Sequence, residues 1–437
     1  MANAGALIDM HTLKMLICRS FHSPWQCVRP GLPGSAGAAA LAWITLIVLL
    51  LAGCGTLPRN AVPSAMTAEA TIPHLPDIRA AAGRPSPIME RDLADSFAQE
   101  RAEDFPRAAD GLIHYAHLAL SGGGPRGAFG AGFLKGWSAS GQRPMFKIVT
   151  GVSTGALIAP FAFLGSAHDD ALHEFYTTTA TQDIFLFRMM SLLPRLLAGE
   201  SLADTRPLVA MIEQYVNGAL LEQIAEAHRR GRRLYIGTVD LDAQHFMVWN
   251  MGLIATSGHP ESLALFRKVM LASSSVPVAF PPVLFPVEAN GQRYDEMHVD
   301  GGVGASMFYN GGLFETSKIR EHAGRGGSRE DIFVVHNGQL TPTPQATPRR
   351  LSSIALRTFE AAGRSATVGD LFRIYTQAQR EQAGFNWITI PDGVDISGAE
   401  VFDPLAMREL YDTGYRQALK GPHWNSYPPG IQGDPRR

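Results

Sequence analysis

The stretch at residues 145–155, MFKIVTGVSTG, decides the fold that we expect for this chain of 437 residues. Its first part, Met145–Val149, is an apolar run of the kind that forms a buried strand, and the ALIA run at residues 156–159 continues as a buried helix. Between them, Gly151 and Gly155 flank Ser153. The chain can therefore pass from strand to helix through a tight elbow that leaves the serine hydroxyl exposed. This pattern predicts an α/β domain with a nucleophilic serine at the end of a strand.

A second glycine-rich turn lies about thirty residues upstream. The apolar run at residues 113–120 predicts a strand, and it ends in the GGGPRG sequence of residues 122–127. Backbone N–H groups in such a loop, aided by the N-terminus of the following helix, can stabilise the oxyanion that forms during acyl transfer. Pro125 has no N–H to contribute. The candidate oxyanion donors are therefore the N–H groups of Gly122, Gly123, Gly124 and Arg126.

The same loop has a competing interpretation, because Gly122, Gly124 and Gly127 also satisfy the G-x-G-x-x-G pattern of dinucleotide-binding proteins. That function requires an acidic residue at the end of the next strand to bind a ribose hydroxyl. Here the next strand ends in the TGVS sequence of residues 150–153, which has no acidic residue. The serine esterase interpretation is therefore favoured. The Arg126 side chain is expected to brace the loop, to face an anionic substrate, or to form a surface ion pair.

The composition suits an enzyme and gives no sign of a nucleic-acid partner. Hydrophobic residues make up 46% of the chain, enough for a large core, and 44 glycines and 29 prolines suit many tight turns. The formal net charge is −2, so the chain lacks the basic character of a nucleic-acid-binding protein.

Asp300 is the best candidate for the base that a nucleophilic serine requires. It closes the YDEMHV run of residues 294–299 and is followed by Gly301 and Gly302, which leave a carboxylate little steric cover. An ordinary Asp-Gly turn is the alternative interpretation. The ASSSVPVAFPPV segment at residues 272–283, which precedes it, favours the catalytic interpretation.

Taken together, these segments resemble the patatin-like phospholipase family. The likeness rests on the 122–127 loop, the 151–155 elbow, the 272–283 segment and the Asp300-Gly301-Gly302 turn, in that order. The MRELYDTGY run at residues 407–415 is similar to the family's closing helix, whereas the VGAS sequence at residues 303–306 lacks an asparagine often found there.

The resemblance implies a three-layer α/β/α domain with a largely parallel central sheet. It also implies a catalytic dyad of Ser153 and Asp300 without histidine, which hydrolyses acyl esters of lipids through an acyl-enzyme. The glycines implied to support the site are Gly127, Gly151, Gly155, Gly301 and Gly302. No metal or organic cofactor is expected, and the expected partners are membrane phospholipids or lysophospholipids.

Two alternatives remain open at this point. His336 follows Ser153 and Asp300 in the chain order of an α/β-hydrolase triad, so a Ser-Asp-His esterase is the rival mechanism. A catalytically silent envelope scaffold that binds lipid in the same pocket is the rival of another class. His298, two residues before Asp300, is expected to be a hydrogen-bonded structural histidine. The chain has no H-E-x-x-H motif, so a zinc site is not expected.

The first part of the chain is typical of a bacterial lipoprotein precursor. All three cysteines, Cys18, Cys27 and Cys54, lie in it. The apolar run Ala38–Leu51 is short for a membrane span, follows basic residues and ends at the LAGC sequence, which resembles a lipoprotein processing box. We therefore expect a signal peptide at residues 1–53 and lipidation of Cys54. The expected location is the cell envelope, with the outer membrane facing the periplasm as one placement.

The domain boundaries follow from the same pattern. Residues 54–110 are rich in Ala, Pro and charge and predict a lipidated N-terminus and flexible tether, with a short helix near residues 90–100. The catalytic domain is expected at residues 111–420, and residues 421–437 are expected to be a disordered tail. The apolar run Ile184–Leu197 is interpreted either as a lid over the serine or as core.

Alternating strand and helix patterns predict a largely parallel sheet covered on both faces. The expected strands are Ile113–Leu120, Phe146–Val149, Leu234–Val239, Phe246–Asn250, Val283–Val287, Ile332–His336 and Asn386–Ile390. The expected helices are Gly127–Ser138, Ala156–Leu164, Pro207–Asn217, Leu220–His228, Leu263–Ser273, Leu351–Arg380 and Pro404–Leu419, the last with Asp403 as its N-cap.

Overall fold

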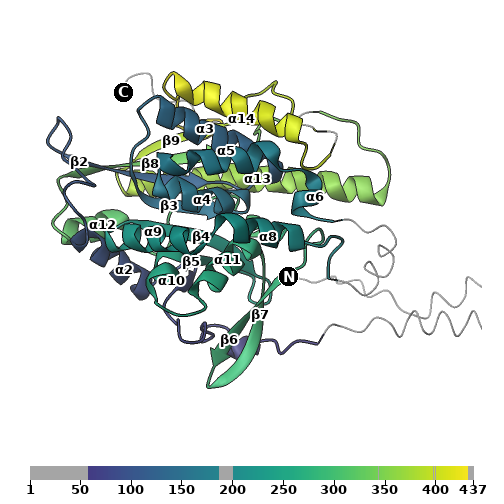
Figure 1. The fold of residues 1–437 in the computed structure, drawn as a ribbon, viewed down its shortest axis with the longest axis horizontal. Coiled ribbons are helices and arrows are strands. Elements are labelled where there is room, and N and C mark those ends of the chain that lie inside the picture. Colours follow the sequence, from purple (N-terminus) through teal and green to yellow (C-terminus); the bar gives the residue numbers. More distant parts are fainter. Residues whose placement is uncertain (1–57, 187–199, 343, 397, 399, 432–437) are drawn as a thin grey trace, which may run out of the picture. The chain divides into compact units, whose positions relative to one another are not determined.

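A computed structural model describes residues 58–186, 200–342, 344–396, 398 and 400–431, all of which belong to one compact unit. A nine-stranded sheet runs through these residues, with helices on both of its faces (Figure 1). None of the helices described in these ranges combines the length and the apolar character needed to span a bilayer.

Five neighbouring strands at the centre of the sheet are parallel, in the order β4-β3-β2-β8-β9. Their bounds are Arg233–Asp240 for β4, Phe146–Val152 for β3, Ile113–Leu120 for β2, Ser328–His336 for β8 and Gly384–Thr389 for β9. Parallel strands end at one edge of a sheet, so the turns that follow β2, β3 and β8 meet there. The expected fold class, an α/β domain with a largely parallel central sheet, is confirmed.

The remaining strands are antiparallel and extend the sheet beside β4. They are β1 (Arg79–Ala81), β5 (His245–Asn250), β6 (Val283–Ala289) and β7 (Gln292–Asp300). β7 pairs with β4 over the last residues of both strands, with Thr238 opposite Asp300. Because β4 lies beside β3, this pairing carries the end of β7 to the edge where β3 ends.

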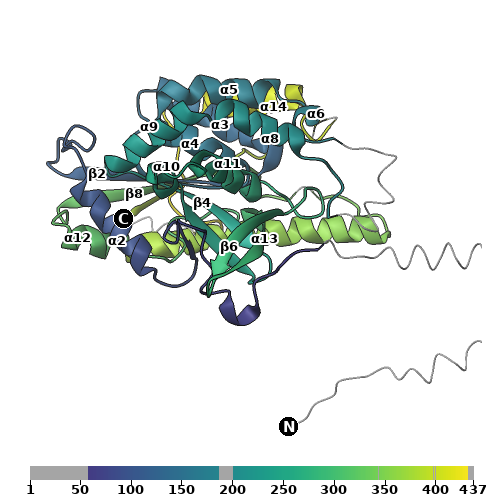
Figure 2. The ribbon, with the colours of Figure 1, turned by 60° about the horizontal axis from the view of Figure 1, so that its bottom comes forward.

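The two faces of the sheet are covered by different helices, because alternate residues of each strand point to opposite sides. In β2, for example, Ala116, Leu118 and Leu120 join one apolar cluster, whereas Ile113 and Tyr115 join another. The first face is covered by α3 (Gly127–Ala139), α4 (Thr154–Leu164), α5 (Asp169–Thr178), α6 (Thr181–Ile184), α8 (Arg206–Tyr215), α9 (Gly218–Arg229), α10 (Met251–Thr256), α11 (Ser262–Ser273) and α14 (Pro404–Leu419). The second is covered by α2 (Pro87–Ala98), α12 (Thr316–His322) and α13 (Leu351–Arg380), as the turned view in Figure 2 shows.

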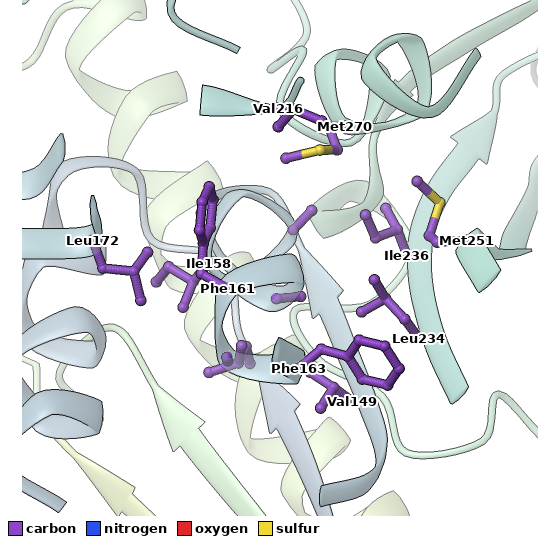
Figure 3. Close-up of a cluster of buried hydrophobic side chains, with 14 of the residues drawn as sticks. Val149, Ile158, Phe161, Phe163, Leu172, Val216, Leu234, Ile236, Met251 and Met270 are labelled. Carbon is purple, nitrogen blue, oxygen red and sulfur yellow. The ribbon is translucent and has the colours of Figure 1, made fainter. Parts of the chain in front are cut away.

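The core of the first face packs against the helix that follows the glycine–serine elbow. Phe163 of α4 lies beside Val149 of β3 and Leu234 of β4, whereas Ile158 lies on the side of α4 towards Leu172 of α5 (Figure 3). These side chains are almost completely buried. Close packing of this kind holds α4, and therefore the turn before it, rigidly on the sheet.

The structure corrects the expected tether at residues 54–110 for the part of it that is described. Pro87 occupies the first turn of α2, and the Ser86 side chain accepts a hydrogen bond from the Met89 N–H, as in an N-cap. Met89, Leu93 and Phe97 of α2 are buried in the second-face core. The compact domain therefore begins well before residue 111, because α2 supplies apolar side chains that this face of the sheet needs.

The expected tail at residues 421–437 also needs correction over its described residues. Trp424 packs its ring against Trp137 and Phe333, with centroid distances of 5.0 Å in both cases. Asn425 exchanges two backbone hydrogen bonds with Trp387 of β9. Residues up to 431 are thus part of the domain, and aromatic contacts rather than regular structure hold them.

All seven expected strands and all seven expected helices are confirmed, with ends shifted by a few residues. The Asp403 N-cap is confirmed as well, since its side chain accepts hydrogen bonds from the N–H groups of Leu405 and Ala406. The signal peptide and Cys54 lie outside the described residues. So does most of the segment Ile184–Leu197, of which Ile184 and Phe185 are buried and Leu186 is exposed.

Candidate active site

Ser153 lies in a strained elbow between β3 and α4. Its φ and ψ angles are 55° and −125°, a conformation that a residue with a side chain seldom adopts. A Cβ at Gly151 would overlap the carbonyl oxygen of Gly155, and a Cβ at Gly155 would overlap that of Leu120. Both positions therefore need glycine because backbone approaches them closely, as the sequence pattern indicated.

The Ser153 hydroxyl donates a hydrogen bond of 2.6 Å to Oδ2 of Asp300. The other carboxylate oxygen, Oδ1, accepts the N–H of Gly302 at 2.7 Å. The two residues are 147 positions apart in the chain, and the pairing of β7 with β4 brings them together. One oxygen of Asp300 is thus held by the backbone, and the other is directed at the serine proton.

Burial changes the acid–base behaviour of Asp300. The side chain is almost completely buried, and this burial raises its pKa to about 6, although the hydrogen bonds from Ser153 and Gly302 oppose the rise. A carboxylate with this pKa is a stronger base than a free aspartate and is still largely ionised at neutral pH. The site therefore has a base matched to proton transfer from a hydroxyl.

The end of α11 and the residues after it tie the two members of the pair together. Ser273 Oγ accepts the N–H of Ser153 at 3.0 Å and donates to the carbonyl oxygen of Gly237 at 2.6 Å. The carbonyl oxygen of Ser275 accepts the N–H of Asp300 at 2.9 Å. The sequence pointed to residues 272–283 as a segment, but it did not show that Ser273 and Ser275 hold the nucleophile and the base.

The glycine loop lies directly beside the nucleophile. A Cβ built on Gly122 would lie 3.2 Å from Ser153 Cβ and 3.8 Å from its Oγ. The N–H of Gly122 donates to the carbonyl oxygen of Ser306 at 3.0 Å, and that of Arg126 donates to Gly123 at 3.3 Å. The Gly122 N–H is therefore not available to an oxyanion in this structure. The Arg126 N–H also has an acceptor already, the carbonyl oxygen of Gly123. In the described part of the chain no hydrogen bond uses the N–H of Gly123 or Gly124, so these two fit the predicted role best.

Asn337 braces this loop, and the sequence analysis missed it. Its side-chain amide donates to the carbonyl oxygen of Ser121 at 2.9 Å, and its Oδ1 accepts the N–H of Gly130 in α3 at 3.0 Å. Its backbone N–H donates to Ser121 Oγ at 2.8 Å. A Cβ at Gly123 would overlap the carbonyl oxygen of Asn337. The only signal in the sequence was its place directly after the predicted strand that ends at His336.

A second brace comes from α13. The Ser306 N–H donates to Oδ2 of Asp370 at 2.6 Å, and Thr367 Oγ1 donates to Ser306 Oγ at 2.9 Å. Since the Ser306 carbonyl oxygen holds Gly122, the middle of α13 is linked to the glycine loop through one residue.

The histidines lie apart from the Ser153–Asp300 pair. His336 Nδ1 bonds to Thr389 Oγ1 at 2.9 Å, and burial together with the charge of Arg126 lowers its pKa to about 3. His298 bonds through Nδ1 to Thr238 at 2.9 Å and through Nε2 to Glu296 at 3.1 Å. The rival Ser-Asp-His triad is therefore not formed in the structure, and His298 is hydrogen-bonded as expected.

Asp240, Glu296 and His298 bring three metal-ligating side chains within 4.8 Å of one another on β4 and β7. However, the Arg79 guanidinium donates to both Glu296 oxygens, one of them at 3.0 Å. A cation already occupies the place where a metal would bind, so the donor set fits an ion-pair network better than a metal centre. This network stabilises the strand that carries Asp300.

The comparisons with known proteins agree with this geometry. The sequence profile of the patatin-like phospholipase family matches residues 118–309, a span that begins in β2 and includes the glycine loop, Ser153 and Asp300. Residues 118–309 are thus similar to the patatin-like phospholipase family, and this match supports a lipid hydrolase function. No curated protein matches the sequence.

Two solved structures share a distant likeness with the chain. VipD from Legionella pneumophila is 12% identical with a TM-score of 0.32, over 72% of this chain and 69% of that one. Human GIVD cytosolic phospholipase A2 is 10% identical with a TM-score of 0.30, over 78% of this chain and 63% of that one.

Proposed function

We propose that the protein is a serine-dependent lipid acyl hydrolase of phospholipase A or lysophospholipase type, with Ser153 as nucleophile and Asp300 as general base. The observation that carries the proposal is the hydrogen bond of 2.6 Å between Ser153 Oγ and Asp300 Oδ2. It lies within the span that matches the family profile. The expected product is a free fatty acid.

In the first half of the reaction, Ser153 Oγ attacks the carbonyl carbon of the ester while Asp300 accepts the serine proton. The carbonyl oxygen becomes an oxyanion, which the N–H groups of Gly123 and Gly124 are placed to stabilise. When the intermediate collapses, the bond to the leaving alcohol breaks and Asp300 returns the proton to that oxygen. The acyl chain remains on Ser153.

In the second half, Asp300 accepts a proton from a water molecule, which attacks the acyl-enzyme carbonyl. The bond from carbon to Ser153 Oγ then breaks, the proton passes to Oγ, and the fatty acid leaves. One carboxylate can serve both halves because each half returns it to its ionised form. The elevated pKa of Asp300 supports this role, since both proton transfers require a competent base.

Hydrolysis of a short-chain p-nitrophenyl ester tests the proposal with Ser153→Ala, Asp300→Asn and His336→Ala beside the wild type. We expect Ser153→Ala and Asp300→Asn to lose about 10³-fold or more in kcat. His336→Ala is expected to stay close to the wild type, because its ring bonds to Thr389 rather than to the pair. Activity that survives Ser153→Ala would overturn the mechanism.

The same assay separates the alternatives. Loss of activity in His336→Ala with retention in Asp300→Asn would favour the Ser-Asp-His triad. A wild type that binds lipid but hydrolyses neither soluble esters nor phospholipid would favour the silent scaffold. The bonded and buried state of the Ser153–Asp300 pair supports the enzyme over the scaffold.

We also infer that the protein is anchored to the cell envelope through a lipid on Cys54. The support is the LAGC sequence that ends the apolar run Ala38–Leu51. Metabolic labelling with palmitate, compared between the wild type and Cys54→Ala, tests this inference. Absence of label in the wild type would refute it.

A further inference from the structure

The N-terminal half of α13 contributes no buried side chain to the core that the described residues form. No residue from 351 to 366 is buried, and the first buried residue of the helix is Thr367. One end of α13 extends past the rest of the domain in Figures 1 and 2, and the packed residues identify that end as the N-terminal one. These sixteen residues span about 24 Å of helix.

This exposed half carries large apolar side chains. Leu351 is 86% exposed, Ile354 50% and Phe359 76%. With Ala355 and Ala362 they follow the spacing i, i+3, i+4, i+8 and i+11, so they form one face of the helix. An apolar face of this extent is unfavourable in water, because a soluble helix derives most of its stability from packing such a face.

The same segment is also basic. Residues 349–366 contain four arginines, Arg349, Arg350, Arg357 and Arg364, and one acidic residue, Glu360, which gives a net charge of +3. Arg357 pairs with Glu360 at 2.8 Å. Arg349 and Arg350 precede the first helical residue, whereas Arg357 and Arg364 lie on the side of the helix away from Leu351 and Phe359. An apolar helical face beside arginines is typical of helices that lie in the surface of an anionic bilayer.

The exposed half of α13 ends at Thr367, where the helix meets the candidate active site. Thr367 and Asp370 hold Ser306, and Ser306 holds Gly122 of the glycine loop. Exposed apolar side chains also border the dyad: Val303, three residues after Asp300, is 55% exposed, and Val278, three residues after Ser275, is 70% exposed.

From this geometry we propose that residues 349–366 dock the domain on an anionic phospholipid surface and so bring the mouth of the active site to its substrate. The inference rests on the proposed function, because docking on lipid serves a lipid hydrolase. Its evidence is the exposed apolar face of α13 and the positive charge of residues 349–366. The charge of the segment favours anionic lipid over a second copy of the chain, because two such helices would bring a charge of +3 against +3.

Amide hydrogen exchange tests the contact directly. The full chain with Ser153→Ala is mixed with vesicles of phosphatidylcholine alone or of phosphatidylcholine with phosphatidylglycerol. The substitution prevents consumption of the lipid. Exchange in residues 351–366 is expected to slow with the anionic vesicles and to change little with the neutral ones. Unchanged exchange in residues 351–366 with both vesicles would overturn the proposal, even if the apolar run Ala38–Leu51 binds to the vesicles.

Paired substitutions give a second measurement. Leu351→Ser with Phe359→Ser is expected to weaken binding to anionic vesicles about tenfold or more, since two apolar side chains no longer enter the lipid. The matched control is Met145→Ser with Leu419→Ser, which removes two exposed apolar side chains from the opposite edge of the sheet. The control is expected to bind like the wild type. Arg349→Gln and Arg350→Gln are each expected to weaken anionic binding about fivefold.

Hydrolysis of a soluble p-nitrophenyl ester separates this inference from the proposed function. The Leu351→Ser, Phe359→Ser protein should hydrolyse the soluble ester like the wild type while it loses activity on vesicle phospholipid. If the wild type does not hydrolyse the soluble ester, the proposed function fails, whereas the vesicle measurements still decide the docking. Equal vesicle binding by the α13 and control variants would overturn the docking. A change from dimer to monomer in the α13 variant, with vesicle binding intact, would assign the face to self-association instead.

Discussion

The Ser273 hydroxyl holds the backbone of Ser153 through a hydrogen bond of 3.0 Å from the Ser153 N–H. In its elbow conformation, Ser153 departs from the regular geometry of both β3 and α4, so a side chain must satisfy this buried N–H. Ser273 in turn donates to the carbonyl oxygen of Gly237 in β4. The strained backbone of Ser153 is therefore fixed to the neighbouring strand through one hydroxyl group.

Ser273→Ala is expected to lower both activity and stability. The substitution leaves the buried Ser153 N–H without its Ser273 partner, which costs about 1–3 kcal/mol in the free energy of unfolding. The elbow would also lose its support, and we expect kcat for a soluble ester to fall about tenfold to a hundredfold with a smaller change in KM. Ser257→Ala is the control, because the Ser257 hydroxyl bonds to local backbone groups, the carbonyl oxygen of Ile254 and the N–H of His259. Wild-type kcat in Ser273→Ala would contradict the positioning role.

The activity is expected to rise with pH around the pKa of Asp300. Burial raises this pKa to about 6, and only the ionised carboxylate can accept the Ser153 proton. Below that pH the carboxyl group is protonated and kcat/KM should fall about tenfold for each unit of pH. Measurement of kcat/KM for a soluble ester across this range checks the prediction. His336→Ala should show the same profile, because the His336 pKa, at about 3, lies well below it. A profile that shifts in His336→Ala would point to the histidine as base.

Asp300→Asn is expected to become more stable relative to the wild type as the pH rises. The pKa of Asp300 is raised by folding from 3.8 to about 6, so its contribution to stability is present below pH 3.8 and is lost as the pH rises through about 6. Between about pH 5 and pH 8 the difference in unfolding free energy between variant and wild type should grow by about 1.4 kcal/mol. Other titrating groups are common to both proteins and cancel in the difference. Chemical denaturation at several pH values measures it, and a constant difference would contradict a raised pKa.

The sequence was enough to predict the central strands and the main helices, and it singled out Ser153 and Asp300, which the structure places in hydrogen-bond contact. Strand and helix patterns are local, and Ser153 and Asp300 stand beside glycines, which permit the tight turns and close backbone approach that such a site needs. The order of the glycine loop, the elbow and the aspartate turn along the chain indicated that Ser153 and Asp300 belong to one site.

The parts that the sequence did not predict depend on contacts between distant segments. α2 was assigned to a tether because its apolar residues, Met89, Leu93 and Phe97, have meaning only against the second face of the sheet. Gly122 was included among the oxyanion donors because its bond to Ser306, far along the chain, cannot be read locally.

Asn337 was missed for the same reason. It is one of many polar residues at strand ends, and its partners Ser121 and Gly130 lie more than 200 positions away. Only the parallel pairing of β8 with β2 places it beneath the glycine loop.

Asn337→Ala is expected to loosen the oxyanion loop. The substitution removes the hydrogen bonds to the Ser121 carbonyl oxygen and to the Gly130 N–H, and it leaves both groups buried near the start of α3. We expect the free energy of unfolding to fall by about 2–4 kcal/mol. The loss of loop geometry should lower kcat about tenfold to a hundredfold, since the N–H groups of Gly123 and Gly124 must point at the oxyanion.

The pH profile and a neighbouring amide distinguish this positioning role from general damage. In Asn337→Ala the inflection near pH 6 should remain, because the Ser153–Asp300 bond does not involve Asn337. Asn386→Ala, on the adjacent strand β9, removes an amide outside the loop and should leave kcat near the wild-type value. If Asn337→Ala were destabilised yet kept the wild-type kcat, Asn337 would serve stability alone, and the oxyanion donors would have to be held by other contacts.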